Sequence, residues 1–136
     1  MPTKRVSKKQ TRASTHPVKK VSAESKKIIE KIRRLVADLP EMTEVLAWGE
    51  PTWRVKGKLF AQFDNHHHGS EHIAVWIPGA PGQQEALIES DPERFFRPPY
   101  VGHKGWVAII LDGKPDWGMV AALLEGAHGL IAAKKR

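Results

Sequence analysis

Residues 48–64, WGEPTWRVKGKLFAQFD, form the stretch that decides the fold of this chain. Within it, residues 52–56 alternate apolar side chains with polar or basic ones, which is typical of a strand with one buried face. Gly57 allows a tight turn, and residues 59–64 are again rich in apolar side chains. We therefore expect two strands joined as a hairpin, which indicates an antiparallel sheet.

Segments on both sides of this hairpin also follow helical or strand patterns. The first helix is expected to begin after the N-cap candidate Ser22 and to end before Pro40. The expected elements are that helix to about residue 38, strands over 44–48, 52–56, 59–64, 72–77 and 106–111, and helices over 83–90 and 116–133. Residues 91–105 are expected to be irregular, with a short extended piece near Tyr100, and Trp106 is expected to be buried in a central strand.

The order of these elements is helix, four strands, helix, one or two strands, helix. Runs of strands joined by short hairpins favour an α+β domain with two layers, in which an antiparallel sheet carries its helices on one face. This order predicts one folded domain over residues 22–136.

Positive charge is concentrated in an N-terminal arm, residues 1–21. The formal net charge of the chain is +7, from 22 basic and 15 acidic residues. The arm has no acidic residue, and its basic residues are Lys4, Arg5, Lys8, Lys9, Arg12, Lys19 and Lys20. The remaining chain is balanced, since 22 − 7 leaves 15 basic residues against 15 acidic ones. With almost nothing apolar to bury, the arm is expected to be disordered.

Several classes of protein are disfavoured by what the sequence lacks. There is no cysteine, so disulfides, iron–sulfur clusters, thiolate zinc sites and a cysteine nucleophile are excluded. This composition fits a reducing compartment, and we expect a cytoplasmic protein without a membrane partner. No Walker loop, dinucleotide fingerprint, nucleophile elbow or H-E-x-x-H motif is present. We therefore expect no cofactor and assign no catalytic residue.

Three segments taken in order resemble the MmcQ/YjbR family. They are WGEPTWRVKGKLFA at 48–61, PPYVGHKGWV at 98–107, and DW at 116–117 leading into LL at 123–124. The resemblance covers residues 24–133 and implies a two-layer α+β domain with an antiparallel sheet, DNA binding, and no catalytic residues. The last helix of the family commonly carries a Ser-Tyr pair, where this chain has Ala127-His128.

Two basic segments of the folded domain are candidates for contact with nucleic acid. The hairpin tip could lie along phosphates, or be a solvated turn. The loop around Pro98-Pro99 could bind, or be fastened to the core by Phe96 and Tyr100. The candidate contacts are the seven basic residues of the arm, then Arg54, Lys56 and Lys58 of the hairpin, and Arg97, Tyr100 and Lys104 of the loop.

A histidine cluster, His66-His67-His68 with His72, is the obvious candidate for a metal site. Zinc needs three or four converging ligands, whereas neighbouring side chains of an extended segment point to opposite sides. Gly69-Ser70 makes the loop pliable. We therefore expect no metal, and a polar loop with at most a mild response to pH.

Three functions stay open on the sequence. A nucleic-acid-binding module, with DNA as the partner, would show a continuous basic stripe. A protein-interaction domain would show an exposed apolar patch on a sheet face or edge. A small-molecule-binding domain or enzyme would show a pocket near Arg97, Tyr100 and His103. In each case we expect a monomer or a weak dimer.

Overall fold

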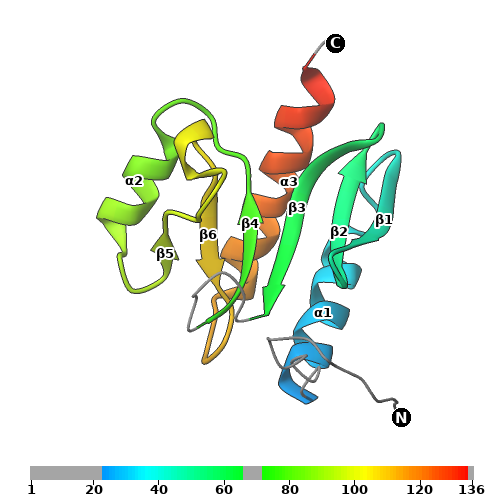
Figure 1. The fold of residues 1–136 in the computed structure, drawn as a ribbon, viewed down its shortest axis with the longest axis horizontal. Coiled ribbons are helices and arrows are strands. Elements are labelled where there is room, and N and C mark those ends of the chain that lie inside the picture. The colour runs from blue at the N-terminus through cyan, green and yellow to red at the C-terminus, as the bar shows by residue number, and fades with distance from the viewer. Residues whose placement is uncertain (1–22, 66–71, 135–136) are drawn as a thin grey trace, which may run out of the picture.

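A computed structural model describes residues 23–65 and 72–134, which contain three α-helices and six strands (Figure 1). The elements are α1 (Ala23–Val36), β1 (Met42–Ala47), β2 (Glu50–Val55), β3 (Lys58–Asn65), β4 (Ile73–Ile77), α2 (Gln83–Ser90), β5 (Phe95–Phe96), the 3₁₀ turn η1 (Gly102–Lys104), β6 (Val107–Ile110) and α3 (Trp117–Ala133). The predicted order and the α+β class are confirmed. The arm and the His66–His68 cluster lie outside the described residues.

All six strands belong to one antiparallel sheet, in the order β1-β2-β3-β4-β6-β5. The predicted hairpin is β2–β3, and Val55 pairs with Lys58 across its two-residue turn. Both turn residues have positive φ, 53° at Lys56 and 79° at Gly57. This left-handed geometry matches the twist of the flanking strands, which is why glycine is favoured in such turns.

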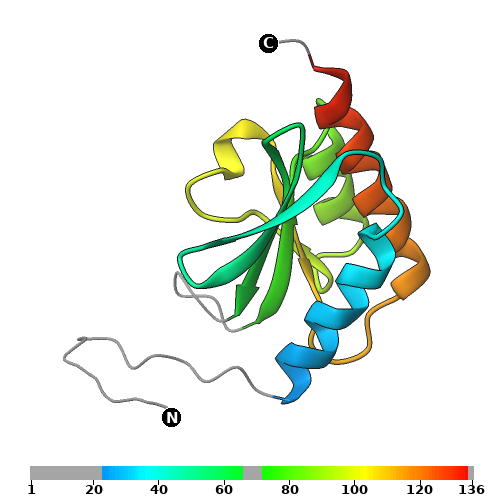
Figure 2. The same ribbon diagram turned by 90° about the vertical axis from the view of Figure 1, so that its right-hand side faces the viewer.

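The helices cover one face of the sheet and form the main core with it (Figure 2). Alternate residues of the strands face this core, so that Trp53, Val55 and Phe60 are fully buried there. From α1 come Ile28 and Ile32, spaced four apart as one helix face requires. The other helices join the same cluster, α3 through side chains such as Val120 and Leu124, and α2 through Leu87 and Ile88.

On the opposite face of the sheet, a loop covers β4 and β6. Ala74, Trp76 and Ala108 form a second cluster there, and half-buried Val101 and Trp106 pack on it. The prediction for Trp106 was therefore wrong in two respects, because it precedes β6 and is only half-buried. The apolar residues after Trp106 made it look like the first residue of a buried strand. Its side chain instead packs on the sheet face opposite the helices, next to the loop.

The predicted extended piece near Tyr100 was also misplaced. The short strand of this region is β5, where Phe95 and Phe96 pair with Ile109 and Ala108. Tyr100 instead sits in a turn with φ of 68°. Aromatic residues favour strands, so the sequence alone did not separate the two sites.

The sheet has two chemically different ends. The β2–β3 turn, residues 78–82 after β4, and residues 97–105 between β5 and β6 lie at the same end of the sheet, since Ile77 pairs with Val107. We call it the lysine end. The strand directions alone require the β2–β3 turn and the start of α2 to share this end, because β3 and β4 are successive antiparallel strands. The first residue of α1, Ala23, lies at the other end, so the arm joins the domain away from the lysine end (Figure 1).

Candidate nucleic-acid interface

The turn between β2 and β3 presents two ammonium groups. Lys56 is exposed and its Nζ lies 3.8 Å from a carboxylate oxygen of Glu41, which is also exposed. A surface pair of this kind contributes little stability, so the lysine is easily redirected to another anion. Lys58 is half-buried at the start of β3.

Arg54 does not belong to this turn. It lies on the sheet face opposite the helices, because its neighbours Trp53 and Val55 face the core. Its Nε donates a hydrogen bond of 3.4 Å to Thr52 Oγ1, and that hydroxyl donates to the Val45 carbonyl at 2.6 Å. Arg54 is thus held along the strand, two residues before Lys56.

Residues 97–105 are tied to α2 by one buried amide. Gln84 Nε2 donates to the carbonyl of Gly102 at 2.8 Å and to that of Trp106 at 2.5 Å. A Cβ on Gly79 would come within 2.7 Å of the Gly105 carbonyl oxygen, so the two loops touch backbone to backbone. The loop is therefore a rigid support for its basic side chains.

Arg97 and Lys104 are exposed on this support. Arg97 lies across Gly102, where an added Cβ would come within 2.6 Å of the Arg97 Cγ. Tyr100 is 70% exposed, whereas Phe96 packs on the second cluster. Of the two aromatic residues expected to fasten the loop, Phe96 does so and the Tyr100 ring largely faces solvent.

A cavity of about 480 Å³ opens beside this loop at the lysine end. It lies between residues 79–82, η1 and the last turn of α3. Its ionisable lining residues are Arg97, His103, Lys104, Lys134 and Glu85. Lys134 was missed by the sequence reasoning, because its place beside the loop depends on how α3 crosses the sheet.

Glu50 is a second residue that the sequence reasoning did not single out. It begins β2 at the end of the sheet opposite the lysine end, and its Oε2 accepts a hydrogen bond of 3.0 Å from the Asn65 N–H. Burial raises the pKa of Glu50 to about 7, and this hydrogen bond opposes the rise. The carboxyl is therefore shared between its two charge states near neutral pH.

The described residues offer no metal site. His72 Nδ1 lies 3.3 Å from Asp112 Oδ1, but within residues 23–65 and 72–134 no group of three or more His, Asp or Glu residues is placed to hold a metal ion. Nor does any helix of these residues have the length and apolarity to cross a membrane.

An exposed apolar strip marks the β1 edge of the sheet. Val45 is 41%, Leu46 69% and Trp48 81% exposed. β1 is the first strand in the sheet order, so one side of its backbone faces outward. This strip is the feature expected of an interaction surface.

Comparisons with known proteins agree with the fold. A family model described as YjbR matches residues 37–130, more than half of the chain. The Deinococcus radiodurans protein DR2400, with a DUF419 domain, superposes with a TM-score of 0.67 at 20% identity, over 78% of this chain and 79% of that one. A Bacillus subtilis protein from the DUF1801 family gives 0.52 at 17% identity, over 80% and 81%. These two similarities show a shared fold, and no curated protein matches.

Proposed function

This chain belongs to the YjbR family, and we propose that it binds DNA through the lysine end of its sheet, with the basic arm adding non-specific affinity. The observation that carries the proposal is the gathering of basic side chains from separate segments at one end. They are Lys56, Lys58, Arg97, Lys104 and Lys134.

Most of these cations are available to an external anion. Among the described residues, Lys58, Arg97, Lys104 and Lys134 form no ion pair, and Lys56 has only the exposed contact with Glu41. Cations that are not neutralised within the protein can replace the counterions around DNA phosphates, which is the main source of non-specific affinity. Direct contacts of this kind also fix the orientation of a protein on the duplex.

The arm and the lysine end would contact different stretches of one duplex. The arm joins the domain at the opposite end of the sheet. An extended chain reaches about 3.3 Å per residue, so roughly 20 residues span about 65 Å and can follow the DNA beyond the domain. Tyr100, three residues after Arg97, offers a ring to a sugar or an unpaired base.

Charge reversal at the lysine end tests this proposal. In the full chain, Lys56→Glu with Lys58→Glu is compared with Lys26→Glu with Lys114→Glu, which changes the net charge equally at the other end of the sheet. Fluorescence anisotropy with duplex DNA at about 50 mM salt should show a loss of tenfold or more for the first pair and a much smaller loss for the second. Equal losses, or no binding by the unaltered chain, would refute the lysine end as the contact.

A second function, protein interaction, is favoured by the strip of Val45, Leu46 and Trp48. Apolar side chains beside an open strand edge suit a partner that adds a strand. Leu46→Ser should then reduce a concentration-dependent association seen by analytical ultracentrifugation. If the unaltered chain stays monomeric at all concentrations and shows the DNA binding described above, this second function is dismissed.

A further inference from the structure

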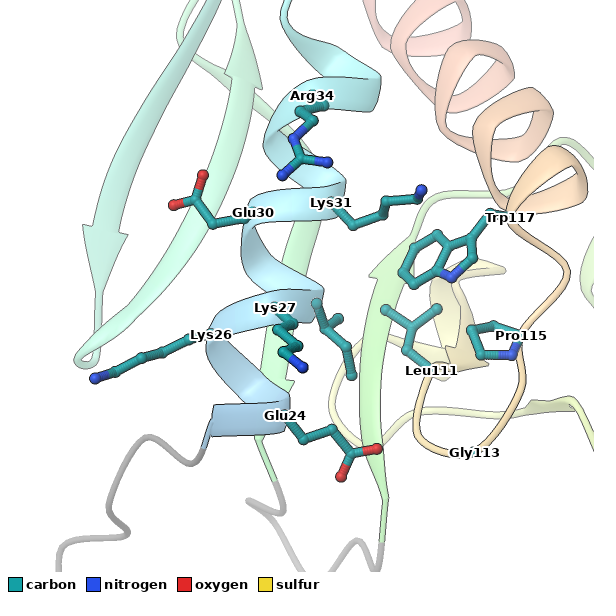
Figure 3. A pocket seen from close by; sticks show the side chains of 11 residues that line it. Glu24, Lys26, Lys27, Glu30, Lys31, Arg34, Leu111, Gly113, Pro115 and Trp117 are labelled. Atoms are coloured by element: carbon teal, nitrogen blue, oxygen red, sulfur yellow. The ribbon is translucent and has the colours of Figure 1, made fainter.

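A second hollow lies between α1 and the segment that leads from β6 into α3 (Figure 3). It has a volume of about 560 Å³ and opens to solvent. Its apolar lining residues are Ile28 from α1, Leu111 after β6, and Pro115 and Trp117 at the start of α3. We call it the Trp117 groove.

One face of α1 brings cations to this groove. Lys27, Lys31 and Arg34 are spaced four and three residues apart, so they follow one side of the helix. Figure 3 shows Lys31 extending toward Trp117, while Lys26, which also lines the hollow, extends away from Leu111 on the other side of the helix. Lys31 Nζ lies 5.8 Å from the centre of the Trp117 ring, which is a cation–π distance.

The charge of the groove is not balanced by its own carboxylates. Its two acidic lining residues are Glu24 and Glu30, and Glu30 is already bound to Arg33 at 2.6 Å. Within the described part of the chain, Lys27, Lys31 and Arg34 make no ion pair. A set of cations around an apolar floor is complementary to an anion that carries a flat, apolar part.

We propose that the Trp117 groove binds a nucleoside phosphate. The base stacks on the Trp117 indole, and the phosphate is bound by Lys27, Lys31 and Arg34. Stacking on an aromatic side chain suits any base, since every base has a π-face. Several cations at one place match a doubly charged phosphate better than a singly charged carboxylate. Lys31 has a flexible stem, so its ammonium can turn from the indole to the phosphate when a base arrives.

This site is separate from the lysine end, because α1 begins and β6 finishes at the other end of the sheet. The nucleotide could be free in solution or an unpaired nucleotide of a strand. Both sources present the same base and phosphate to the groove, and the experiment distinguishes them.

Titration of the full chain with AMP, followed by NMR at the tryptophan indole N–H signals, tests the site. AMP should shift the Trp117 signal and bind about tenfold or more tightly than adenosine, which lacks the phosphate, or ribose 5-phosphate, which lacks the base. A single strand of six deoxyadenylates, run in parallel, shows which source is preferred. Equal affinity for AMP and ribose 5-phosphate would reduce the groove to a patch of charge and overturn the proposal.

Matched variants locate the binding. Lys27→Gln should weaken AMP binding about tenfold, whereas Lys114→Gln, which removes the same charge from a residue that does not line the groove, should leave it unchanged. Trp117→Phe keeps a ring in the core and should weaken binding less than Trp117→Leu. Equal effects of the two lysine variants would contradict the site. Duplex binding is measured separately, so failure here would leave the lysine end standing.

Discussion

Glu50 places a carboxyl group where its charge is costly. The Asn65 N–H donates to it, but burial outweighs that hydrogen bond and raises its pKa to about 7. The folded protein therefore holds this proton more tightly than the unfolded chain, whose glutamate titrates near 4.3. Stability from this group is present at acid pH and is lost as the pH rises through about 7.

Replacing Glu50 by glutamine should remove this dependence on pH. The amide keeps an oxygen to accept from Asn65 and carries no charge to desolvate. The melting temperature of Glu50→Gln should exceed that of the unaltered protein at pH 8, and the difference should shrink toward pH 5. Thermal unfolding across this range checks it, with the exposed Glu125→Gln as control. A constant difference at all pH values would show that Glu50 does not titrate in this window.

Trp48 has an unfavourable backbone conformation. Its φ is 55° and that of Gly49 is 81°, so the β1–β2 turn needs two left-handed residues. Asparagine is strongly preferred over tryptophan at the first of these positions. Since the indole is 81% exposed, little packing is lost on its removal. Trp48→Asn should therefore raise the free energy of unfolding by about 0.5–1 kcal/mol, measured in urea. A fall in stability would mean that the indole has a stabilising contact.

One polar contact joins helix α3 to the segment that precedes β1. His128 is buried, its Nε2 donates to the Pro40 carbonyl at 2.8 Å, and its ring meets that of Phe60 edge-on at 5.2 Å. This residue stands where the family commonly has a tyrosine, and here it joins α3 to the segment between α1 and β1.

Removal of this contact should loosen the whole helix. His128→Ala leaves the Pro40 carbonyl without its donor and opens a gap beside Phe60, so the free energy of unfolding should fall by about 2–3 kcal/mol. Urea unfolding measures it, and the exposed Gly129→Ala, one residue further along α3, should cause no such loss. A change in the free energy of unfolding below about 0.5 kcal/mol would mean that residues other than His128 hold α3 in place.

Elements with a local signal could be predicted from the sequence, and those that depend on the crossing of elements could not. The β2–β3 hairpin was predictable because alternation and Gly57 lie within a dozen residues. Trp106 was misjudged because its neighbours on the far face, Ala74 and Trp76, belong to a strand about 30 residues away in the sequence. The shared end of the β2–β3 turn and the start of α2 follows from strand directions alone, but Lys134 joins this end only through the angle of α3 across the sheet. The Trp117 groove was not foreseen, because α1 and residues 111–117 are brought together only by the fold.

Most of the long-range electrostatics of the molecule should belong to the arm. Seven of its residues are basic and none is acidic, whereas the rest of the chain is balanced. On B-form DNA, log K falls by about 0.9 per log unit of salt for each phosphate neutralised. Deletion of residues 1–21 should thus flatten the salt slope by several units and leave the melting temperature nearly unchanged. Affinities at four salt concentrations check the slope, and an unaltered slope would mean that the arm does not touch DNA.

Helices α1 and α3, which both pack on the sheet, stand at opposite ends of the domain's sequence. During synthesis all six strands emerge before α3. The part of the sheet that α3 covers therefore stays exposed until the final helix has been made. On the ribosome this face is an apolar surface in need of a temporary cover, and we expect a chain stopped before residue 117 to be held by a chaperone or to precipitate. The apolar face of the sheet is therefore fully covered only after the seventeen residues of α3 have been synthesised.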